Sequence, residues 1–392
     1  MKIALFADTY YPQINGVVTS VRMLEKELIK KGHDVFIYCT TDPNVKRTDK
    51  KKTPFVFRLP SIRLWFLPTH RLAFFYTPAI IFKIKKIKPD IIHTHTEYPV
   101  GFFGWLMSLF CRAPMVHTYH TMYKDYVHYA RKGMGPILGK FFTVETAHKL
   151  SRNFCNKAKA VITPTEKVKQ YLFEVGVAKP INIIPTGVDV SHFYGRNFLS
   201  EELDSLRAEF GIGAEDRIIL TVGRVAKEKN MYALVSMMPE VLKKIPNAKL
   251  LIVGDGPMRE PLSETAREKG ISGSVIFAGY RKWEEIGKFY KICDLFMTAS
   301  TSETQGLTHI EAMASGKPVA VINDESFTGI VRDGETGYVF QTDSDAAEAA
   351  LRVLLDKKKS DAVAANGYAA VQKLSAEQFA INVENVYMSV IK

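Results

Sequence analysis

Two glutamates eight residues apart stand in the stretch SETQGLTHIEAMASG, residues 302–316 of a 392-residue chain. Residues 294–299 before it have the composition of a buried strand, and the apolar spacing after Gly306 predicts a helix that stops near Gly316. At a rise of ~1.5 Å per helical residue, Glu303 and Glu311 are about 10 Å apart. Carboxylates that act together on one glycosidic bond lie ~5 to 9.5 Å apart. The spacing therefore favours two carboxylates that hold separate groups.

The two carboxylates and the helix start between them match the parts of a nucleotide sugar. A carboxylate has two acceptor oxygens and suits the neighbouring hydroxyls of a ribose or a hexose. The first amides of the helix present free N–H groups and the positive end of the helix dipole to a phosphate. The residues predicted to meet that phosphate are Gln305, Gly306, Leu307 and Thr308. The alternative stays open: Glu303 is a surface residue and Glu311 lies on the solvent face of the helix.

A pair of cations follows another predicted strand, over residues 217–222. The loop GRVAKEKN carries Arg224 and Lys229, which could neutralise a diphosphate leaving group. On its own, a basic pair in a loop is more often solvated. The stretch GDGP at residues 254–257 predicts a turn, and Tyr280 in FAGY stands at a strand end where a base could stack.

The stretch INGVVTS follows the strand predicted at residues 2–7 and opens a helix at Gly16. A residue without a Cβ lets the backbone approach a ligand. Gly16 is therefore a candidate for contact with the donor, although a simple turn would use the same residue.

The elements that position these residues alternate between short apolar strands and amphipathic helices. This βαβ rhythm predicts parallel sheets in two doubly wound domains, whose ligands bind outside the carboxyl ends of the strands. The domains are predicted at residues 1–187 and 188–374, with residues 375–392 forming a terminal helix that crosses back to the N-terminal domain. The strands are predicted at residues 2–7, 34–40, 90–95, 115–119, 160–164, 217–222, 249–253, 275–278, 294–299 and 318–322.

Four histidines lie at strand ends, in the stretches IIHTH and VHTYHT: His93, His95, His117 and His120. Because Glu97 is the only carboxylate nearby, core or donor-lining roles are favoured over a metal site. The one Asp-x-Asp stretch, Asp343-Ser344-Asp345, precedes a predicted helix at residues 346–355. It is interpreted as a helix cap, and no metal is expected.

Positive charge is concentrated in the first half of the chain. Residues 1–190 contain 29 Lys and Arg against 13 Asp and Glu, whereas residues 191–392 contain 24 against 28. Residues 62–88 interleave lysines and arginines with aromatic residues and contain no acid. From Pro78 onward, isoleucines form one stripe of a helix and lysines fill its other faces. This composition is typical of a helix at an anionic lipid surface. The alternatives are buried aromatics with solvated lysines, or a nucleic-acid surface without a recognisable nucleic-acid-binding fold.

The bulk composition predicts an ordinary globular protein of a reducing compartment. With 46% apolar and 24% charged residues the chain can bury two cores. The four cysteines form no CxxC pair, no signal peptide is expected, and the apolar runs are shorter than the ~18 residues needed to cross a bilayer. We therefore expect a cytoplasmic protein, peripheral on the inner face of the cell membrane.

Taken in order, the stretches INGVVTS, HTYHTMY, PTGVDVSHF, GRVAKEKN, VGDGP, FAGY and SETQGLTHIEAMASGKPV resemble the GT-B glycosyltransferases of family 4. These are retaining enzymes with a Glu-x7-Glu signature, and the version here looks closest to bacterial diacylglycerol glucosyltransferases. The resemblance covers nearly the whole chain. It implies two Rossmann-like domains that face each other across a cleft, with no metal requirement.

The resemblance also implies a role for individual residues. Glu303 would hold donor-sugar hydroxyls and Glu311 the nucleotide ribose. Arg224 and Lys229 would hold the diphosphate, with Gly16 approaching it from the opposite domain. His120 would line the sugar near the reacting carbon. Family members often have two glycines at Asn15-Gly16 and a Gly-Phe-Gly run at Thr304-Gln305-Gly306, so these departures bear on donor identity.

The predicted activity is transfer of a hexose, glucose from UDP-glucose, to the 3-hydroxyl of 1,2-diacylglycerol with α stereochemistry. The predicted partners are the diacylglycerol acceptor and anionic lipids that meet residues 62–88, and nucleic acid is not among them. Two alternatives remain. One is a family 4 enzyme for another acceptor, such as phosphatidylinositol, a monoglycosyl lipid or a soluble sugar. The other is a non-catalytic lipid-binding protein.

Overall fold

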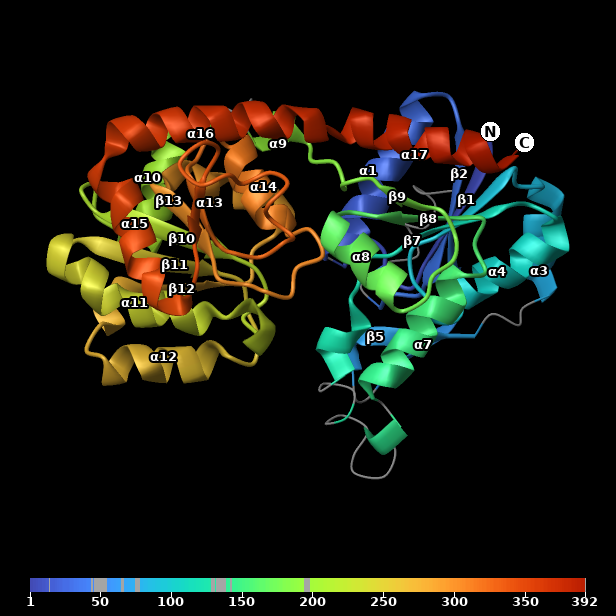
Figure 1. Ribbon diagram of the computed structural model, residues 1–392, viewed down its shortest axis with the longest axis horizontal. Coiled ribbons are helices and arrows are strands. Elements are labelled where there is room, and N and C mark those ends of the chain that lie inside the picture. The colour runs from blue at the N-terminus through green and yellow to red at the C-terminus, as the bar shows by residue number, and fades with distance from the viewer. Residues whose placement is uncertain are drawn as a thin grey trace. The chain divides into compact units, whose positions relative to one another are not determined.

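The computed structural model describes residues 1–13, 15–43, 45, 55–64, 67–74, 78–127, 131, 139–141, 143–193 and 198–391. These residues form two compact units: unit 1 comprises residues 1–187 and 376–392, and unit 2 comprises residues 188–375 (Figure 1). Each unit is a parallel sheet covered by helices. No helix in the described part of the chain is long and apolar enough to cross a membrane.

Unit 1 contains a seven-stranded sheet in the order β3-β2-β1-β6-β7-β8-β9. The order reverses between β1 and β6, because β2 and β3 lie on one side of β1 and the later strands on the other. The strands are β1 Lys2–Ala7, β2 Asp34–Thr40, β3 Val56–Leu59, β6 Ile91–Thr94, β7 Met115–Thr118, β8 Ala160–Thr163 and β9 Ile181–Ile183; an antiparallel pair, β4 Ser61–Leu64 and β5 Leu67–Ala73, stands apart.

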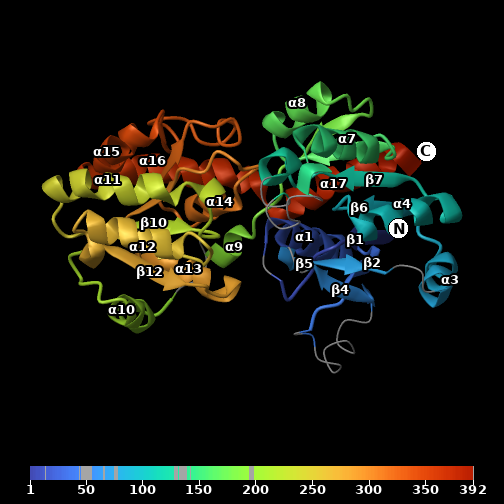
Figure 2. The same ribbon diagram turned by 90° about the horizontal axis from the view of Figure 1, so that it is seen from below.

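The inner strands of the seven-stranded sheet bury both faces, as strands of a covered parallel sheet must. Along β1, Ile3 and Leu5 belong to one core while Ala4 and Phe6 belong to the other. One core is closed by α1 and the C-terminal helix α17, which lie side by side (Figure 1, Figure 2). The helices are α1 Gly16–Lys30, α3 Pro78–Ile87, α4 Pro99–Cys111, α7 Val144–Cys155, α8 Glu166–Glu174 and α17 Ala376–Ile391, with short 3₁₀ turns η1 Tyr123–Tyr126 and η2 Gly139–Phe141.

Unit 2 has a six-stranded parallel sheet in the order β12-β11-β10-β13-β14-β15, which is the Rossmann strand order. The strands are β10 Arg217–Val222, β11 Ala248–Val253, β12 Val275–Gly279, β13 Leu295–Thr298, β14 Val319–Ile322 and β15 Tyr338–Phe340. The helices are α9 Val190–Phe193, α10 Ser200–Glu209, α11 Met231–Lys244, α12 Arg259–Glu268, α13 Trp283–Ile292, α14 Leu307–Ala314, α15 Ala346–Leu355 and α16 Lys357–Val371; the 3₁₀ turns are η3 Lys227–Lys229, η4 Ser272–Ser274, η5 Asp343–Asp345 and η6 Gln372–Leu374.

The helix predicted from Pro78 forms, but its isoleucine stripe faces the protein. Ile84 is fully buried, and the other isoleucines of the stripe pack against the core that α4 also covers. An apolar stripe already packed on the unit's own core is not free to enter a bilayer. On the outer side of α3 stand its lysines and Phe82, which is 72% exposed. Residues 65–66 and 75–77, which carry four of the predicted aromatics, lie outside the described residues.

Candidate active site

The predicted site residues of unit 2 cluster at the point where its strand order reverses. β10 and β13 are neighbours in the sheet. The strand after β10, which is β11, lies on one side of this pair, and the strand after β13, which is β14, lies on the other side. The loop after β10 carries Arg224 and Lys229, and the loop after β13 carries Glu303. Ligands of doubly wound sheets bind at this edge. The topology thus brings together residues that are about 75 positions apart in sequence.

Lys229 and Glu303 form an ion pair, with Nζ 2.5 Å from Oε1. Burial alone would raise the pKa of Glu303, but Lys229, Ser300 and His309 together hold the pKa below its ordinary value. Glu303 is therefore an ionised acceptor at neutral pH, and it is not a surface residue as the alternative interpretation had it. Both side chains retain some exposure, 24% for Lys229 and 17% for Glu303, so a ligand can reach them.

Arg224 forms an ion pair with Glu228, a residue that the sequence pattern had not singled out. Glu228 is almost fully buried, while the Arg224 side chain remains nearly half exposed. The hydroxyls of Ser300 and Ser302 donate to the backbone carbonyl of Glu228 at 3.3 and 3.1 Å, which ties the loop after β13 to the loop after β10. The cationic loop is therefore anchored at Glu228 through both its side chain and its carbonyl.

The stretch GDGP bends the chain after β11 and leads into a hydrogen-bonded turn from Gly256 to Arg259, and it also supports the cationic loop. A Cβ on Gly254 would lie 1.8 Å from the carbonyl oxygen of Gly223, and one on Gly256 would lie 2.3 Å from that of Val225. The Val225 amide donates to the Asp255 carbonyl at 3.0 Å. Only residues without a Cβ permit this backbone approach, so the two glycines set the position of the loop that holds Arg224.

Gly306 begins α14 in the left-handed region, with φ +74°. A Cβ there would crowd Phe327, His309 and Glu303 at 3.0, 3.2 and 3.3 Å. Glycine is therefore required for two independent reasons, its backbone conformation and its neighbours. The first amides of α14 follow at Leu307 and Thr308, and Gln305 before them is buried.

Glu311 is buried on the inner side of α14, so the interpretation that placed it on a solvent face is wrong. The hydroxyl of Tyr290 donates to its Oε2 at 2.9 Å and lies 3.1 Å from the Thr308 carbonyl. Burial raises the pKa of Glu311 to about 7, against the effect of the Tyr290 hydrogen bond. Tyr290 was missed in the sequence because it lies on α13, in another core-facing helix. Glu303 and Glu311 thus have different partners and different acidities.

His309, on the first turn of α14, is completely buried, and neither ring nitrogen has a hydrogen-bond partner with suitable geometry among the described residues. Its ring packs edge-on against Phe327 at 4.9 Å between centroids. Burial lowers the pKa of His309 to about 4, although the Glu303 carboxylate opposes the shift. The ring is thus neutral beside the carboxylate.

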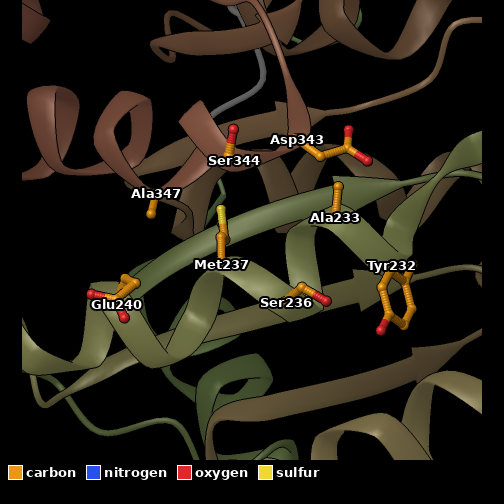
Figure 3. A pocket seen from close by; sticks show the side chains of 8 residues that line it. All are labelled: Tyr232, Ala233, Ser236, Met237, Glu240, Asp343, Ser344 and Ala347. Atoms are coloured by element: carbon orange, nitrogen blue, oxygen red, sulfur yellow. The ribbon is translucent and has the colours of Figure 1, made fainter.

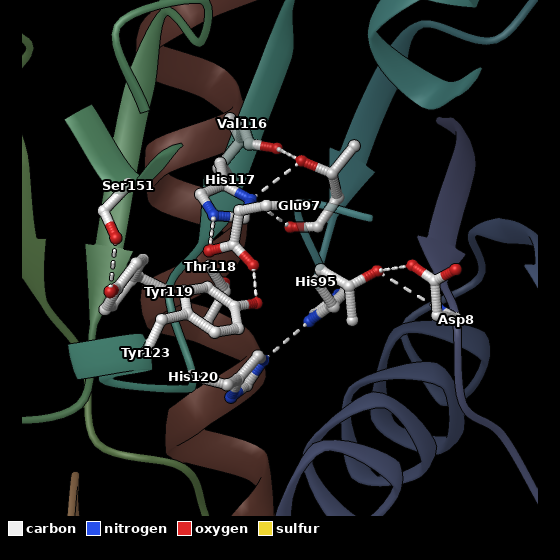
Figure 4. Close-up of polar contacts among 12 residues, drawn as sticks. Asp8, His95, Glu97, Val116, His117, Thr118, Tyr119, His120, Tyr123 and Ser151 are labelled. Atoms are coloured by element: carbon white, nitrogen blue, oxygen red, sulfur yellow. Dashed lines mark hydrogen bonds and ion pairs between the residues drawn. The ribbon is translucent and has the colours of Figure 1, made fainter. Parts of the chain in front are cut away.

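The four histidines predicted at strand ends of unit 1 all make hydrogen bonds, and Figure 4 shows those of His95, His117 and His120. His95 Nδ1 and His120 Nε2 are hydrogen-bonded at 3.0 Å. His93 is held between the Tyr387 hydroxyl of α17 and the Thr118 hydroxyl, at 2.6 and 2.7 Å. Burial, followed by the neighbouring His117, lowers the pKa of His120 to about 3. His120 is therefore a neutral hydrogen-bonding group at physiological pH.

Two acidic residues, Glu97 and Asp8, lie near these histidines, and only Glu97 was noted in the sequence. Glu97 had been noted as the only nearby carboxylate, and it accepts from His117 Nε2 at 3.0 Å and from the Tyr123 hydroxyl. Asp8, just after β1, had been missed. It accepts from the Thr96 hydroxyl and, at 3.3 Å, from the Val100 amide in the first turn of α4. Burial raises the pKa of Asp8 to about 7.

Gly16 is exposed at the first position of α1, where Asn15 caps the helix by accepting from the Val18 amide at 2.9 Å. A Cβ on Gly16 would meet nothing within 4 Å, and its φ is not positive. Unit 1 itself therefore does not demand glycine at this position. Tyr280 follows β12 and is 61% exposed.

The described residues contain no group of three or more metal-ligating side chains. In the Asp-x-Asp stretch, Asp345 accepts from the Thr342 amide and hydroxyl at 2.9 Å, and Asp343 accepts from the Asn230 amide group. Asp345 thus stands at the N-cap position of α15, as predicted, but its side chain completes a capping box with Thr342 at η5 and bonds no amide of α15. A shallow pocket of about 320 Å³ lies beside this turn on α11 and α15 (Figure 3), and none of the predicted site residues lines it.

Family models match both halves of the chain: "Glycosyltransferase Family 4" over residues 14–192 and "Glycosyl transferases group 1" over residues 203–370. The alpha-monoglucosyldiacylglycerol synthase of Streptococcus pneumoniae is 36% identical over 396 residues, covering all of this chain and 86% of that protein. The Acholeplasma laidlawii protein of the same name is 31% identical, covering 100% and 98%.

Among solved structures, HepE of Anabaena in complex with UDP-glucose superposes with a TM-score of 0.77 at 18% identity, covering 99% of this chain and 100% of that one. A likeness at this identity concerns the fold, which is GT-B. The sequence relatives extend over the full chain and exceed 30% identity. The chain therefore belongs to glycosyltransferase family 4 and is an enzyme of the GT-B fold that transfers a glycosyl group.

Proposed function

We propose that this protein is a retaining hexosyltransferase that moves glucose from UDP-glucose to the 3-hydroxyl of 1,2-diacylglycerol, giving an α-glucosyl lipid. The observation that carries the proposal is the full-length similarity to two alpha-monoglucosyldiacylglycerol synthases, one of them at 36% identity. The geometry of unit 2 supports it, because an ionised Glu303 beside Lys229 and a buried Glu311 beside Tyr290 offer separate places for sugar and ribose hydroxyls.

In this proposal the residues of unit 2 hold the donor. Glu303 accepts hydrogen bonds from the hexose and Glu311 from the ribose, while Tyr280 stacks on the base. Arg224 and Lys229 neutralise the diphosphate. The remaining diphosphate contacts come from the Gly16 backbone and from Gln305, Gly306, Leu307 and Thr308 at the start of α14. With two cations and a helix N-terminus at the leaving group, the proposed reaction requires no metal ion.

The proposed chemistry is substitution on one face of the sugar. The bond from the anomeric carbon to the phosphate oxygen breaks, and a bond to the acceptor hydroxyl oxygen forms on the same face. The departing phosphate takes the hydroxyl proton, so no separate base is needed. His120 donates or accepts a hydrogen bond at the sugar near this carbon. Arg224 and Lys229 act mainly by stabilising the charge that develops on the phosphate.

The proposed place of action is the inner face of the cell membrane, with unit 1 as the acceptor-binding and membrane-binding domain. Support comes from exposed apolar side chains on two adjacent helices, α3 and α4: Phe82 at 72%, and Leu109 and Phe110 at 59% each. The ammonium of Lys85 lies 5.5 Å from the centre of the Phe110 ring, so base and aromatic share one surface. Such a surface fits the boundary of an anionic bilayer.

The test is transfer by the purified protein from labelled UDP-glucose to vesicles that contain diacylglycerol, with and without phosphatidylglycerol. We expect a labelled monoglucosyl lipid with the α anomer and a higher rate on anionic vesicles. Label in another acceptor, such as phosphatidylinositol, a monoglycosyl lipid or a soluble sugar, would replace diacylglycerol with that acceptor. An unlabelled lipid fraction with every donor tried, together with no donor hydrolysis, would favour a non-catalytic lipid-binding protein.

A further inference from the structure

We propose that Glu97 is a positioning residue that fixes the loop carrying His120, an inference that rests on the function proposed above. Glu97 lies in the loop between β6 and α4, and its side chain is 2% exposed. Its two oxygens accept from two residues of the neighbouring loop, His117 and Tyr123. These residues stand three positions before and three positions after His120. One carboxylate therefore holds both sides of the segment that presents the imidazole (Figure 4).

The two donors are themselves held in place. His117 is completely buried at the end of β7, and its Nδ1 lies 2.9 Å from the Thr94 hydroxyl and 3.0 Å from the Thr94 carbonyl on β6. Tyr123 begins η1, the turn that follows His120. Its ring packs edge-on against Tyr119 and Tyr98. The Glu97 carboxylate thus links a rigid strand end to a short 3₁₀ turn.

A second link joins the same two loops at the imidazole itself. His95, two residues before Glu97, shares the 3.0 Å hydrogen bond with His120, and its ring stacks on that of His120. Tyr119, next to His120 in the same segment, is held separately, because its amide donates to the Ile162 carbonyl at 2.9 Å. In the proposal, Glu97 adds a hold on both flanks of His120 and so restricts the orientation of its ring. Burying a carboxylate costs free energy unless hydrogen-bond donors satisfy it. At Glu97 these donors are His117 and Tyr123.

The test is a double-mutant cycle in the transfer assay with Glu97→Gln and His120→Ala. Because a misplacement near 1 Å can cost about 100-fold in rate, we expect Glu97→Gln to lower kcat by about 10- to 100-fold and to leave KM for UDP-glucose within about twofold. In the His120→Ala background the same change should cost less than about threefold, since Glu97 acts through His120. An equal loss in both backgrounds, or an unchanged kcat in the single variant, overturns the proposal.

Tyr123→Phe is the second variant, which removes one donor and keeps the carboxylate, and it carries the cycle if Glu97→Gln fails to fold. The matched control is Tyr38→Phe. Tyr38 is buried on β2 in the same unit, its ring stacks on Phe6 and Phe57, and its hydroxyl has no hydrogen-bond partner among the described residues. We expect near wild-type kcat for the control. A loss in the control equal to that of Tyr123→Phe would mean that any buried tyrosine hydroxyl matters, and would overturn the assignment.

Amide hydrogen exchange separates this inference from the proposed function. Peptides covering residues 119–127 should exchange faster in Glu97→Gln and Tyr123→Phe than in wild type and Tyr38→Phe, whether or not any transfer occurs. Unchanged exchange in both variants overturns the positioning role. If wild type transfers no sugar, the proposed function fails on its own, and exchange still decides whether Glu97 holds the loop.

Discussion

The ammonium of Lys229 lies 2.5 Å from a carboxylate oxygen of Glu303, although 74 positions of sequence separate the two residues. The contact exists because β10 and β13 are neighbours whose following loops leave the same edge of the sheet. It keeps the Glu303 carboxylate ionised despite burial. Each partner can also bind a ligand: Lys229 can contact a phosphate of the ligand, and Glu303 can accept hydrogen bonds from its hydroxyls.

Replacing Lys229 by alanine should therefore have two effects on the site. It removes a cation from the proposed leaving-group site and leaves Glu303 buried without its ion-pair partner. We expect kcat to fall by about 100-fold or more, with a comparable loss for Arg224→Ala. Steady-state rates of glucosyl transfer measure this. Near wild-type rates in both variants would remove these residues from the diphosphate site.

Glu303→Gln should impair use of the sugar while leaving affinity for free UDP intact.

Glu311 should give the protein a measurable dependence of stability on pH. Burial raises the pKa of Glu311 to about 7 from the ordinary value of 4.5. Between these values the folded protein binds a proton that the unfolded chain has lost, so the free energy of unfolding decreases as pH rises from about 4.5 to about 7. Over this range the total decrease in the free energy of unfolding is roughly 3 kcal/mol, and Glu311→Gln should lack this decrease. Urea unfolding of both proteins across that range checks the sign, and parallel curves would contradict it.

The same residue predicts a pH dependence of nucleotide binding. A ribose hydroxyl donates to the ionised form of Glu311, so UDP affinity of the wild type should increase as pH rises through about 7. In Glu311→Gln the affinity should be lower and independent of this titration. Calorimetric titration with free UDP measures both effects. Equal affinity in wild type and variant would show that Glu311 does not hold the nucleotide.

How much of this site could be read from the sequence depends on how local each signal was. The strand over Leu295–Thr298, the helix over Leu307–Ala314 and the stop at Gly316 follow from apolar spacing and glycine within one stretch, and all were predicted to within a residue or two. Likewise, α15 occupies the predicted residues. Such features depend on neighbours in sequence, and local pattern is sufficient to find them.

The rest depended on contacts between distant segments. Nothing in WEEIGKFYKI indicates that Tyr290 would donate to Glu311, because the partner lies on another helix. The partner of Arg224 was missed for another reason, since Glu228 is close in sequence but was hidden among alternating charges. The short strands β3, β9 and β15 lie at or near sheet edges, where three or four residues give too little alternation to recognise. The isoleucine stripe of α3 was recognised in the sequence. The core of unit 1 that it packs against could not be recognised, because that core is built from distant segments.

Two glycines of the proposed donor site should respond oppositely to alanine. Gly306→Ala places a Cβ against Phe327 and His309 at a positive φ, and should destabilise unit 2 by about 1 to 3 kcal/mol. Gly16→Ala meets nothing in the chain and should leave stability unchanged or slightly raised, since alanine is the better helix former. Its cost should appear only in a higher KM for UDP-glucose. Thermal unfolding and kinetics of the two variants separate these effects, and a destabilised Gly16→Ala would argue against a ligand-facing role.

The C-terminal helix should be indispensable to unit 1. α17 buries Phe379, Val383 and Val386 against the core that α1 also closes, and its Tyr387 hydroxyl bonds His93 at 2.6 Å. Removing residues 376–392 exposes that core and leaves Nδ1 of the buried His93 ring without its Tyr387 partner, while Nε2 keeps its contact with Thr118. We expect unit 1 of the truncated chain to lose its cooperative thermal unfolding, and the amides of β1 and β6 to lose their protection from hydrogen exchange. Full protection of β1 and β6 after truncation would contradict this.

Membrane binding should depend on which phenylalanine is removed. Phe82 on α3 and Phe110 on α4 belong to the surface that also carries Lys85, whereas Phe173 lies on another helix, α8, and is equally exposed, at 70%. The double variant Phe82→Ser and Phe110→Ser should lose most of its binding to vesicles that contain phosphatidylglycerol, because each buried aromatic contributes through apolar area removed from water. Phe173→Ser, the matched control, should bind as wild type does.

Charge can be tested on the same surface without touching the aromatics. Lys85→Glu with Lys86→Glu should weaken flotation with anionic vesicles and remove its dependence on salt, since each base near the surface contributes about 1 kcal/mol. Vesicles of neutral lipid should show little binding by any of these proteins. If the Phe173 control loses as much binding as the Phe82 and Phe110 variant, exposed apolar side chains act without regard to position. If neither the aromatic nor the lysine variant loses binding, the surface of α3 and α4 is not the part of the protein that meets the membrane.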